Sequence, residues 1–141
     1  MTWQEIPGGA LTNCPITAVA APDGDAYVFI TGTDRQIYYN HLKGDSWTGW
    51  TILPGGARTS YSVAAAYDST DALVVLHVGD NGHIYESSRV GSTWTPWSYH
   101  DEEAGTALAP TLLAVGDKLL SFYVAKDGLI HTQTTVTLKG Q

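Results

Sequence analysis

The stretch Trp47-Thr48-Gly49-Trp50-Thr51-Ile52-Leu53-Pro54-Gly55-Gly56-Ala57 recurs in part on both sides of itself. Its second half matches Ile6-Pro7-Gly8-Gly9-Ala10, and its first half matches Trp94-Thr95-Pro96-Trp97. Trp3, Trp50 and Trp97 are therefore spaced 47 residues apart in a chain of 141 residues. A period of this length is typical of propeller blades and similar repeats. The sequence predicts a single module of three units, at about residues 1–47, 48–94 and 95–141.

The middle unit shows its strands most clearly. Short runs rich in β-branched and aromatic residues cover 62–67, 72–78, 83–89 and 95–100, and turns rich in Gly, Asp and Ser separate them. The first of these runs is rich in alanine, as is the run 18–21 in the first unit, which suits the crowded ring around a central channel. No segment has the 3.6-residue period of a helix. The predicted fold class is all-β, a β-propeller of four-stranded blades.

The order of the strands predicts an assembly of two chains. The chain opens with a strand of the fourth type at 3–6, and its last unit contains only strands at 111–115, 119–125 and 129–136. Three blades are too few for a ring, since propellers typically have about 4 to 8. A homodimer that exchanges the N-terminal strand would form a six-bladed ring and cover the exposed edges. The alternative is that the sequence is part of a longer propeller.

Composition excludes several classes of protein. With 43% hydrophobic and 15% charged residues, the chain has the composition of a folded domain. Its net charge of −7 repels nucleic acid and anionic membranes, and its apolar runs are too short for membrane insertion. The start of the chain lacks a signal-peptide core, which favours a cytoplasmic location or release by a non-classical route. Cys14 is the only cysteine, so no intrachain disulfide is possible.

The repeated motif resembles sugar-binding proteins. The pattern Trp-x-x-Trp-x-x-Leu-Pro-Gly-Gly at 47–56, with Gly32-Thr33-Asp34 and Ile37-Tyr38, is similar to the blades of β-propeller lectins, particularly bacterial lectins of the Photorhabdus type. Ile84-Tyr85-Glu86 and Ser92-Thr93-Trp94 also resemble segments of the fungal and bacterial fucose-binding propeller lectins. The sugar-binding arginine of that second family has no counterpart in 73–77. The resemblance implies a propeller fold and a carbohydrate-binding function.

Sugar sites are expected where aromatic rings meet polar side chains, because an aromatic face packs against the apolar face of a pyranose. In the fucose lectins that the chain resembles, a tryptophan stacks on a sugar held by the glutamate of the preceding blade. That arrangement pairs Tyr39 and Asn40 with Trp94, and it pairs Glu86 with the third blade, where no tryptophan matches. The predicted carbohydrate-binding residues are Tyr39, Asn40, Trp47, Glu86 and Trp94. The tryptophans that begin the outer strands are expected to pack between blades: Trp3, Trp50 and Trp97.

No pattern predicts catalysis, a metal or a cofactor. The chain contains no Gly-x-Ser-x-Gly, phosphate-loop or His-Glu-x-x-His motif, and its five histidines lack the short spacing of metal ligands. The predicted function is that of a non-catalytic, multivalent lectin that binds glycans. The alternative is a propeller that serves as a scaffold for protein–protein interaction.

Overall fold

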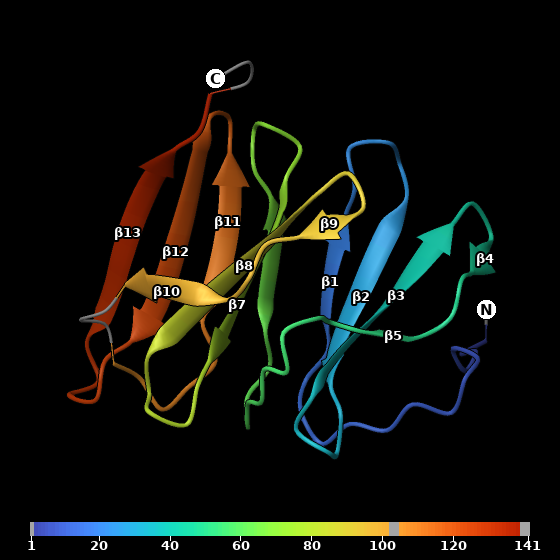
Figure 1. Cartoon of the computed structure of the whole chain (residues 1–141), viewed down its shortest axis with the longest axis horizontal. Helices are drawn as coiled ribbons and strands as arrows, with labels where there is room; N and C mark the ends of the chain where they lie inside the picture. Colours follow the sequence, from blue (N-terminus) through green and yellow to red (C-terminus); the bar gives the residue numbers. More distant parts are fainter. Residues whose placement is uncertain (1, 102–104, 139–141) are drawn as a thin grey trace.

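The computed structural model describes residues 2–101 and 105–138, which form three antiparallel sheets side by side (Figure 1). The first sheet contains β1 (Thr17–Ala20), β2 (Ala26–Thr31), β3 (Ile37–Lys43), β4 (Ser46–Trp47) and β5 (Thr51–Ile52). The second contains β6 (Ala64–Tyr67), β7 (Leu73–Val78), β8 (Ile84–Val90), β9 (Thr93–Trp94) and β10 (Ser98–Asp101). The third contains β11 (Thr111–Val115), β12 (Lys118–Val124) and β13 (Ile130–Val136). The described part of the chain has no helix that could span a membrane.

These sheets are the three predicted blades, so the all-β fold class is confirmed. In each of the first two blades the outermost strand is split into two short pieces. Pro96 lies between β9 and β10 and has no N–H to donate to β8, and Gly49, with φ of 112°, lies at the matching place in the first blade. Within the described residues the third blade has three strands.

The predicted strand at residues 3–6 is not formed within one protomer. These residues have no ladder partner, and the side chain of Trp3 is 102% exposed. Trp3 therefore does not pack between blades within one protomer, because a strand forms only when a neighbour accepts its hydrogen bonds. The N-terminal end of the chain lies beside β4, whereas β13 forms the opposite edge of the molecule (Figure 1). Pairing of this segment with a second chain stays a prediction.

Contacts between indole rings and glycines explain the repeated Pro-Gly-Gly motif. A Cβ added to Gly8 would lie 2.7 Å from Cδ1 of Trp50, and one added to Gly55 would lie 2.5 Å from Cδ1 of Trp97. Both glycines also have positive φ, at 115° and 103°. A side chain at either position would therefore clash with the indole ring and would also strain the backbone. The Nε1–H of Trp97 donates to the carbonyl oxygen of Pro54 at 3.1 Å. Each tryptophan thus packs against the preceding unit of the repeat.

Two apolar clusters hold the blades together. The first interface, between the first and second blades, contains the fully buried side chains of Phe29 and Val75. The second interface, between the second and third blades, contains the fully buried Leu76 together with Ala64, Ala66 and Leu119. The alanines belong to the innermost strand β6, which contacts both β1 and β11. Short side chains there allow the three inner strands to approach one another, as the alanine runs predicted.

His77 is an unusual member of this core. Its ring stacks on Tyr85 at 5.1 Å and meets the ring of Trp97 edge-on at 4.5 Å. The residue is 4% exposed, and this burial lowers the pKa of His77 to about 4 because the charged form loses its hydration. The imidazole is neutral at physiological pH and acts as an aromatic core residue.

Replacement of His77 by Phe is expected to make the protein more resistant to acid. An unfolded chain takes up the proton near pH 6.5 and the folded chain only near pH 4, so stability falls as the pH drops between these values. The loss attributable to His77 reaches about 3 kcal/mol at pH 4. Urea unfolding at several pH values should show this loss in the natural chain and a smaller one in His77→Phe. An equal acid sensitivity of both proteins would show that His77 is not the group responsible, and the exposed His131→Phe is the control.

Candidate functional site

Two of the predicted site residues meet at the first interface. The ring of Tyr39, on β3, lies 5.7 Å from that of Trp94, on β9 of the next blade, at an interplanar angle of 57°. The guanidinium of Arg89 lies over both rings, at 5.9 Å from Tyr39 and 6.0 Å from Trp94. It also lies 5.7 Å from the ring of Tyr27, and its Nη1 donates to the Tyr27 hydroxyl at 3.1 Å. The positive charge is therefore held by three aromatic rings through cation–π attraction.

This packing changes the interpretation of Trp94. The sequence predicted that Trp94 binds a sugar, and in the structure Trp94 is partly exposed and packs against the core of the first interface. Tyr39 and Arg89 occupy its neighbourhood, and its Nε1 is buried without a hydrogen-bond partner among the described residues. The faces of Trp94 that contact Tyr39 and Arg89 are thus engaged within the protein, and only part of its surface is exposed.

Asn40 lies inside the blade. Its side chain is 0% exposed, and Oδ1 accepts hydrogen bonds from the backbone N–H groups of His41 at 2.9 Å and Gly49 at 3.0 Å. These bonds tie β3 to the turn between β4 and β5. The amide of Asn40 stabilises the blade edge, and it has no exposed surface that a ligand could contact.

Trp47 is separate from the other predicted residues. It lies on β4, opposite Leu42 of β3, and it is partly exposed. β4 lies at the edge of the molecule beside the N-terminal segment, away from the second blade (Figure 1). The structure therefore does not bring Trp47 together with Tyr39, Trp94 or Glu86.

An open pocket of about 310 Å³ lies beside Arg89 at the rim of the first interface. Its polar walls are the guanidinium of Arg89, the hydroxyl-bearing rings of Tyr27 and Tyr67, and the two carboxylates of Asp23 and Asp71. Burial raises the pKa of Tyr67 to about 12, so its hydroxyl keeps its proton. The pocket combines cationic and neutral donors, anionic acceptors and aromatic carbon, which is a suitable set for the hydroxyl groups and apolar face of a sugar.

A second open pocket, of about 330 Å³, lies on the opposite face of the first blade. Trp50 and Tyr38 line it together with Gly8, Gly9 and Leu11 of the N-terminal segment. Asp34 supplies a carboxylate at its rim, where Oδ2 accepts a hydrogen bond of 2.6 Å from the Tyr38 hydroxyl. This bond raises the pKa of Tyr38 and lowers the pKa of Asp34. The walls are mainly apolar, so this pocket offers fewer partners for hydroxyl groups than the one beside Arg89.

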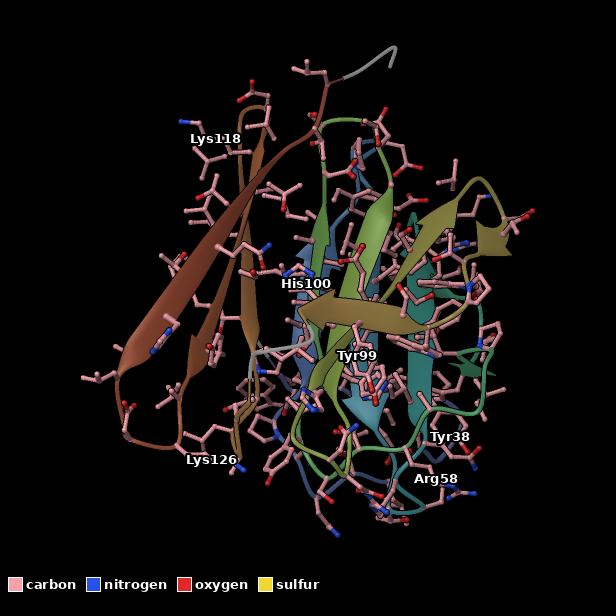
Figure 2. The ribbon with its side chains drawn as sticks, turned by 60° about the vertical axis from the view of Figure 1, so that its left-hand side comes forward. Tyr38, Arg58, Tyr99, His100, Lys118 and Lys126 are labelled. Carbon is pink, nitrogen blue, oxygen red and sulfur yellow. The ribbon has the colours of Figure 1, made fainter. Side chains whose placement is uncertain are left out.

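Glu86 belongs to a different cluster, at the second interface. Its Oε1 is hydrogen-bonded to Nδ1 of His100 at 2.6 Å, and Nε2 of His100 is hydrogen-bonded to Oγ of Ser121 at 2.8 Å. His100 lies at the end of β10 nearest the third blade (Figure 2). A pocket of about 110 Å³ adjoins His100 and Ser121. No group of three potential metal ligands occurs among residues 2–101 and 105–138.

The residues missed from the sequence are Arg89, Tyr27 and Tyr67 at the first interface and His100 and Ser121 at the second. The sequence did contain one signal: Arg89 follows the Ile-Tyr-Glu segment at the end of the same strand, in a chain with three arginines. The contacts of His100 and Ser121 depend on how two blades pack, which the spacing within a unit does not reveal.

No protein-family model and no curated protein sequence matches the chain. Solved structures do resemble it in fold, among them the following three. A fucose lectin from Kordia zhangzhouensis in complex with methyl-fucoside has a TM-score of 0.61 and 13% identity over 89% of this chain and 94% of that one. A mutant of the Aleuria aurantia lectin in complex with α-methyl-L-fucoside has a TM-score of 0.63 and 19% identity over 89% of this chain. AofleA from Arthrobotrys oligospora has a TM-score of 0.67 and 14% identity over 94% of this chain.

These likenesses show the fold alone, because the identities are low. The chain spans 45% of the length of the Aleuria aurantia lectin, whose structure is described as a six-bladed β-propeller, and 42% of AofleA. Three propeller blades are therefore confirmed. That the chain is not an enzyme stays a prediction. The narrower resemblance to lectins of the Photorhabdus type stays a prediction.

The contact between Tyr39 and Trp94 predicts an energetic coupling between the two blades. In a double-mutant cycle of Tyr39→Ala and Trp94→Ala, measured by urea unfolding, we expect a coupling energy of about 0.5 to 1.5 kcal/mol. The same cycle with Trp47→Ala in place of Trp94→Ala is the control, and it should be additive within about 0.5 kcal/mol. Additivity in both cycles would contradict the packed arrangement of Trp94.

Proposed function

We propose that the protein is a carbohydrate-binding lectin, and that two copies complete a propeller ring with sugar pockets at the rims of the blade interfaces. The observation that carries the proposal is the pocket of about 310 Å³ beside Arg89. The likeness in fold between this chain and two lectins described in complex with fucosides supports a sugar as the ligand.

The charges around this pocket favour a neutral sugar. Asp23 and Asp71 can accept hydrogen bonds from hydroxyl groups, and Arg89 can donate to ring or hydroxyl oxygens. Two carboxylates against one guanidinium leave the pocket with a net negative charge, which disfavours the carboxylate of an acidic sugar. Methyl α-L-fucoside is the first ligand to test, since fucosides are the ligands named for the similar lectins.

The exposed face of the third blade supports the dimer. The isoleucine that follows the turn between the second and third strands of each blade is 1% exposed at Ile37 and 2% exposed at Ile84, but 76% exposed at Ile130. Leu113 and Val115 of β11 are 50% and 52% exposed, and every residue of β13 is exposed. This face has the composition of the faces that are covered by a following blade in the first two units, so a second copy of the first blade fits it.

The N-terminal segment supplies the missing outer strand in this dimer. Ile6 corresponds to Leu53, whose N–H donates to the carbonyl oxygen of Ile37 at 2.8 Å. The counterpart bond would run from Ile6 of one copy to Ile130 of the other. Trp3, fully exposed in one protomer, would then lie on the outer edge of the other copy's third blade. Two such exchanges close a ring of six blades and leave no open edge.

Arg89→Leu is expected to abolish sugar binding at the first interface. Leucine occupies the matching position of the first blade, Leu42, so the fold tolerates it there. Loss of the charge-assisted hydrogen bonds should weaken binding of methyl α-L-fucoside at this site at least tenfold, which is about 1.4 kcal/mol, in calorimetry. Arg58→Leu removes an arginine that does not line the pocket beside Arg89, and it should leave the affinity for the sugar unchanged. Failure of the natural chain to bind any neutral sugar, or to agglutinate cells in a way that free sugar inhibits, would favour the scaffold function instead.

Removal of residues 1–6 is expected to convert a dimer into monomers. The deletion removes the exchanged strand and leaves the outer edge of β13, the edge not paired with β12, without a partner. The Trp3→Ala variant tests the contribution of the indole alone. Sedimentation equilibrium at micromolar concentration should give twice the chain mass for the natural protein and a lower mass for the deletion. A stable monomer of the natural chain would exclude the dimer, and larger open assemblies would show a different mode of pairing.

A further inference from the structure

The repeat gives every position at the second interface a counterpart at the first. Glu86 and His100 correspond to Tyr39 and Leu53, each 47 residues earlier. Ser121 corresponds to Val75 by strand register. Val75 pairs with the third residue after Ile84, and Ser121 pairs with the third residue after Ile130. The two interfaces can therefore be compared residue by residue within one chain.

Three apolar positions of the first interface are polar at the second. Tyr39, Leu53 and Val75 all belong to the apolar cluster of the first interface, where Leu53 is 3% exposed and Val75 is 0% exposed. Their counterparts form the hydrogen-bonded chain of Glu86, His100 and Ser121, with distances of 2.6 and 2.8 Å. Because the three polar side chains bond to one another, the change concerns one connected group.

Stability does not account for this group. A buried hydrogen-bonded network with an ionisable pair gives little or no net stability relative to apolar side chains of similar volume. At the first interface, the corresponding positions of the same blade fold hold Tyr39, Leu53 and Val75. The side chain of His100 is 8% exposed and Ser121 is buried, whereas the side chain of Glu86 is 38% exposed, so the network runs from solvent at Glu86 into the interface at Ser121. A polar group kept at this place has a role other than holding the blades together.

The pocket of about 110 Å³ beside the network indicates that role. His100 and Ser121 form one wall, and Ile84 and Tyr123 contribute apolar surface. Each of the remaining lining side chains can exchange hydrogen bonds with hydroxyl groups: His131, Thr132 and Gln133. Because no lysine, arginine or carboxylate lines the pocket, it suits a neutral ligand that carries several hydroxyl groups.

The hydrogen bonds of His100 determine what Ser121 offers to this pocket. A carboxylate only accepts, so Glu86 fixes the proton of the neutral imidazole on Nδ1. Nε2 then accepts the hydroxyl proton of Ser121. The lone pairs of Ser121 Oγ are left to accept a hydrogen bond from a ligand hydroxyl, and His100 acts as a positioning residue.

We propose that the pocket at the second interface is a second site for the terminal neutral sugar of a glycan, built from Ser121, His100 and Gln133 and different in construction from the pocket beside Arg89. This inference rests on the proposed lectin function, and it assigns to each chain two sites of unlike chemistry. Glu86 contributes to the second site through His100.

Ser121 allows a closely matched test, because valine and threonine have nearly the same shape and differ in the hydroxyl group. Calorimetric titration of the natural protein with methyl α-L-fucoside and with a panel of neutral methyl glycosides should show two classes of site. Ser121→Val should remove one class or weaken it at least tenfold, and Ser121→Thr should retain it within about threefold. Equal binding by the natural protein and Ser121→Val would overturn the proposal.

The triple variant Glu86→Tyr, His100→Leu and Ser121→Val gives the second interface the residues of the first. It should unfold at a urea concentration equal to or higher than that of the natural protein, yet lack the second class of site. A marked loss of stability would show that the network is structural and would overturn the argument for a ligand. Nitrogen chemical shifts of the His100 ring should report the tautomer with Nδ1–H and should move on titration with the bound glycoside.

Arg89→Leu separates this inference from the proposed function. If Arg89→Leu removes one class of sugar site and Ser121→Val removes the other, both the lectin function and the second site stand. If Arg89→Leu loses sugar binding while Ser121→Val binds as the natural protein does, the lectin function stands and the second site is refuted. Absence of any sugar binding in the natural protein refutes both.

Discussion

Each blade buries an apolar face only when another blade lies against it, and this requirement governs the whole structure. The side chains of Phe29, Val75 and Leu76 have no exposed surface because a neighbouring sheet covers them, and a single sheet has no second layer of its own. Trp97 of the second blade packs against Gly55 and donates to the Pro54 carbonyl oxygen, in the turn that follows the first blade, and so adds a contact between the two blades. The third blade presents the same kind of face to solvent, so the requirement that explains the core also explains why the chain should associate.

The sequence predicted the features that repeat within a unit. The 47-residue period, the alanine-rich inner strands and the positions of β7, β8, β11, β12 and β13 all follow from local patterns of side chains and turns. Asn40 was assigned to a sugar site from the resemblance to fucose-binding lectins, whereas its amide oxygen accepts hydrogen bonds from two backbone N–H groups inside the blade. His100 and Ser121 could not be paired from the sequence, because their contact crosses two blades and depends on the packing angle between sheets.

The two interfaces have diverged in chemistry while keeping one backbone. At the first, a cation is enclosed by the rings of Tyr27, Tyr39 and Trp94 and opens onto a wide pocket with carboxylates at its rim. At the second, a smaller pocket without charged lining residues lies beside the hydrogen-bonded chain of Glu86, His100 and Ser121. Repeat architectures permit this divergence because each unit contacts only its neighbours, so a change at one interface leaves the other undisturbed.

Unlike sites on one rigid body have a consequence for recognition. Two identical weak sites raise the affinity for any surface that displays a single sugar, since the second contact is made at high effective concentration. Two sites of different chemistry give that gain only to a surface that displays both ligands within the span of the ring. Because the blades are fixed to one another by buried side chains, the spacing between the pockets is fixed as well. With the proposed sugar sites, a module that has one pocket lined by charged side chains and one lined by uncharged side chains would therefore distinguish glycan surfaces by composition and spacing, although each pocket contacts only one sugar.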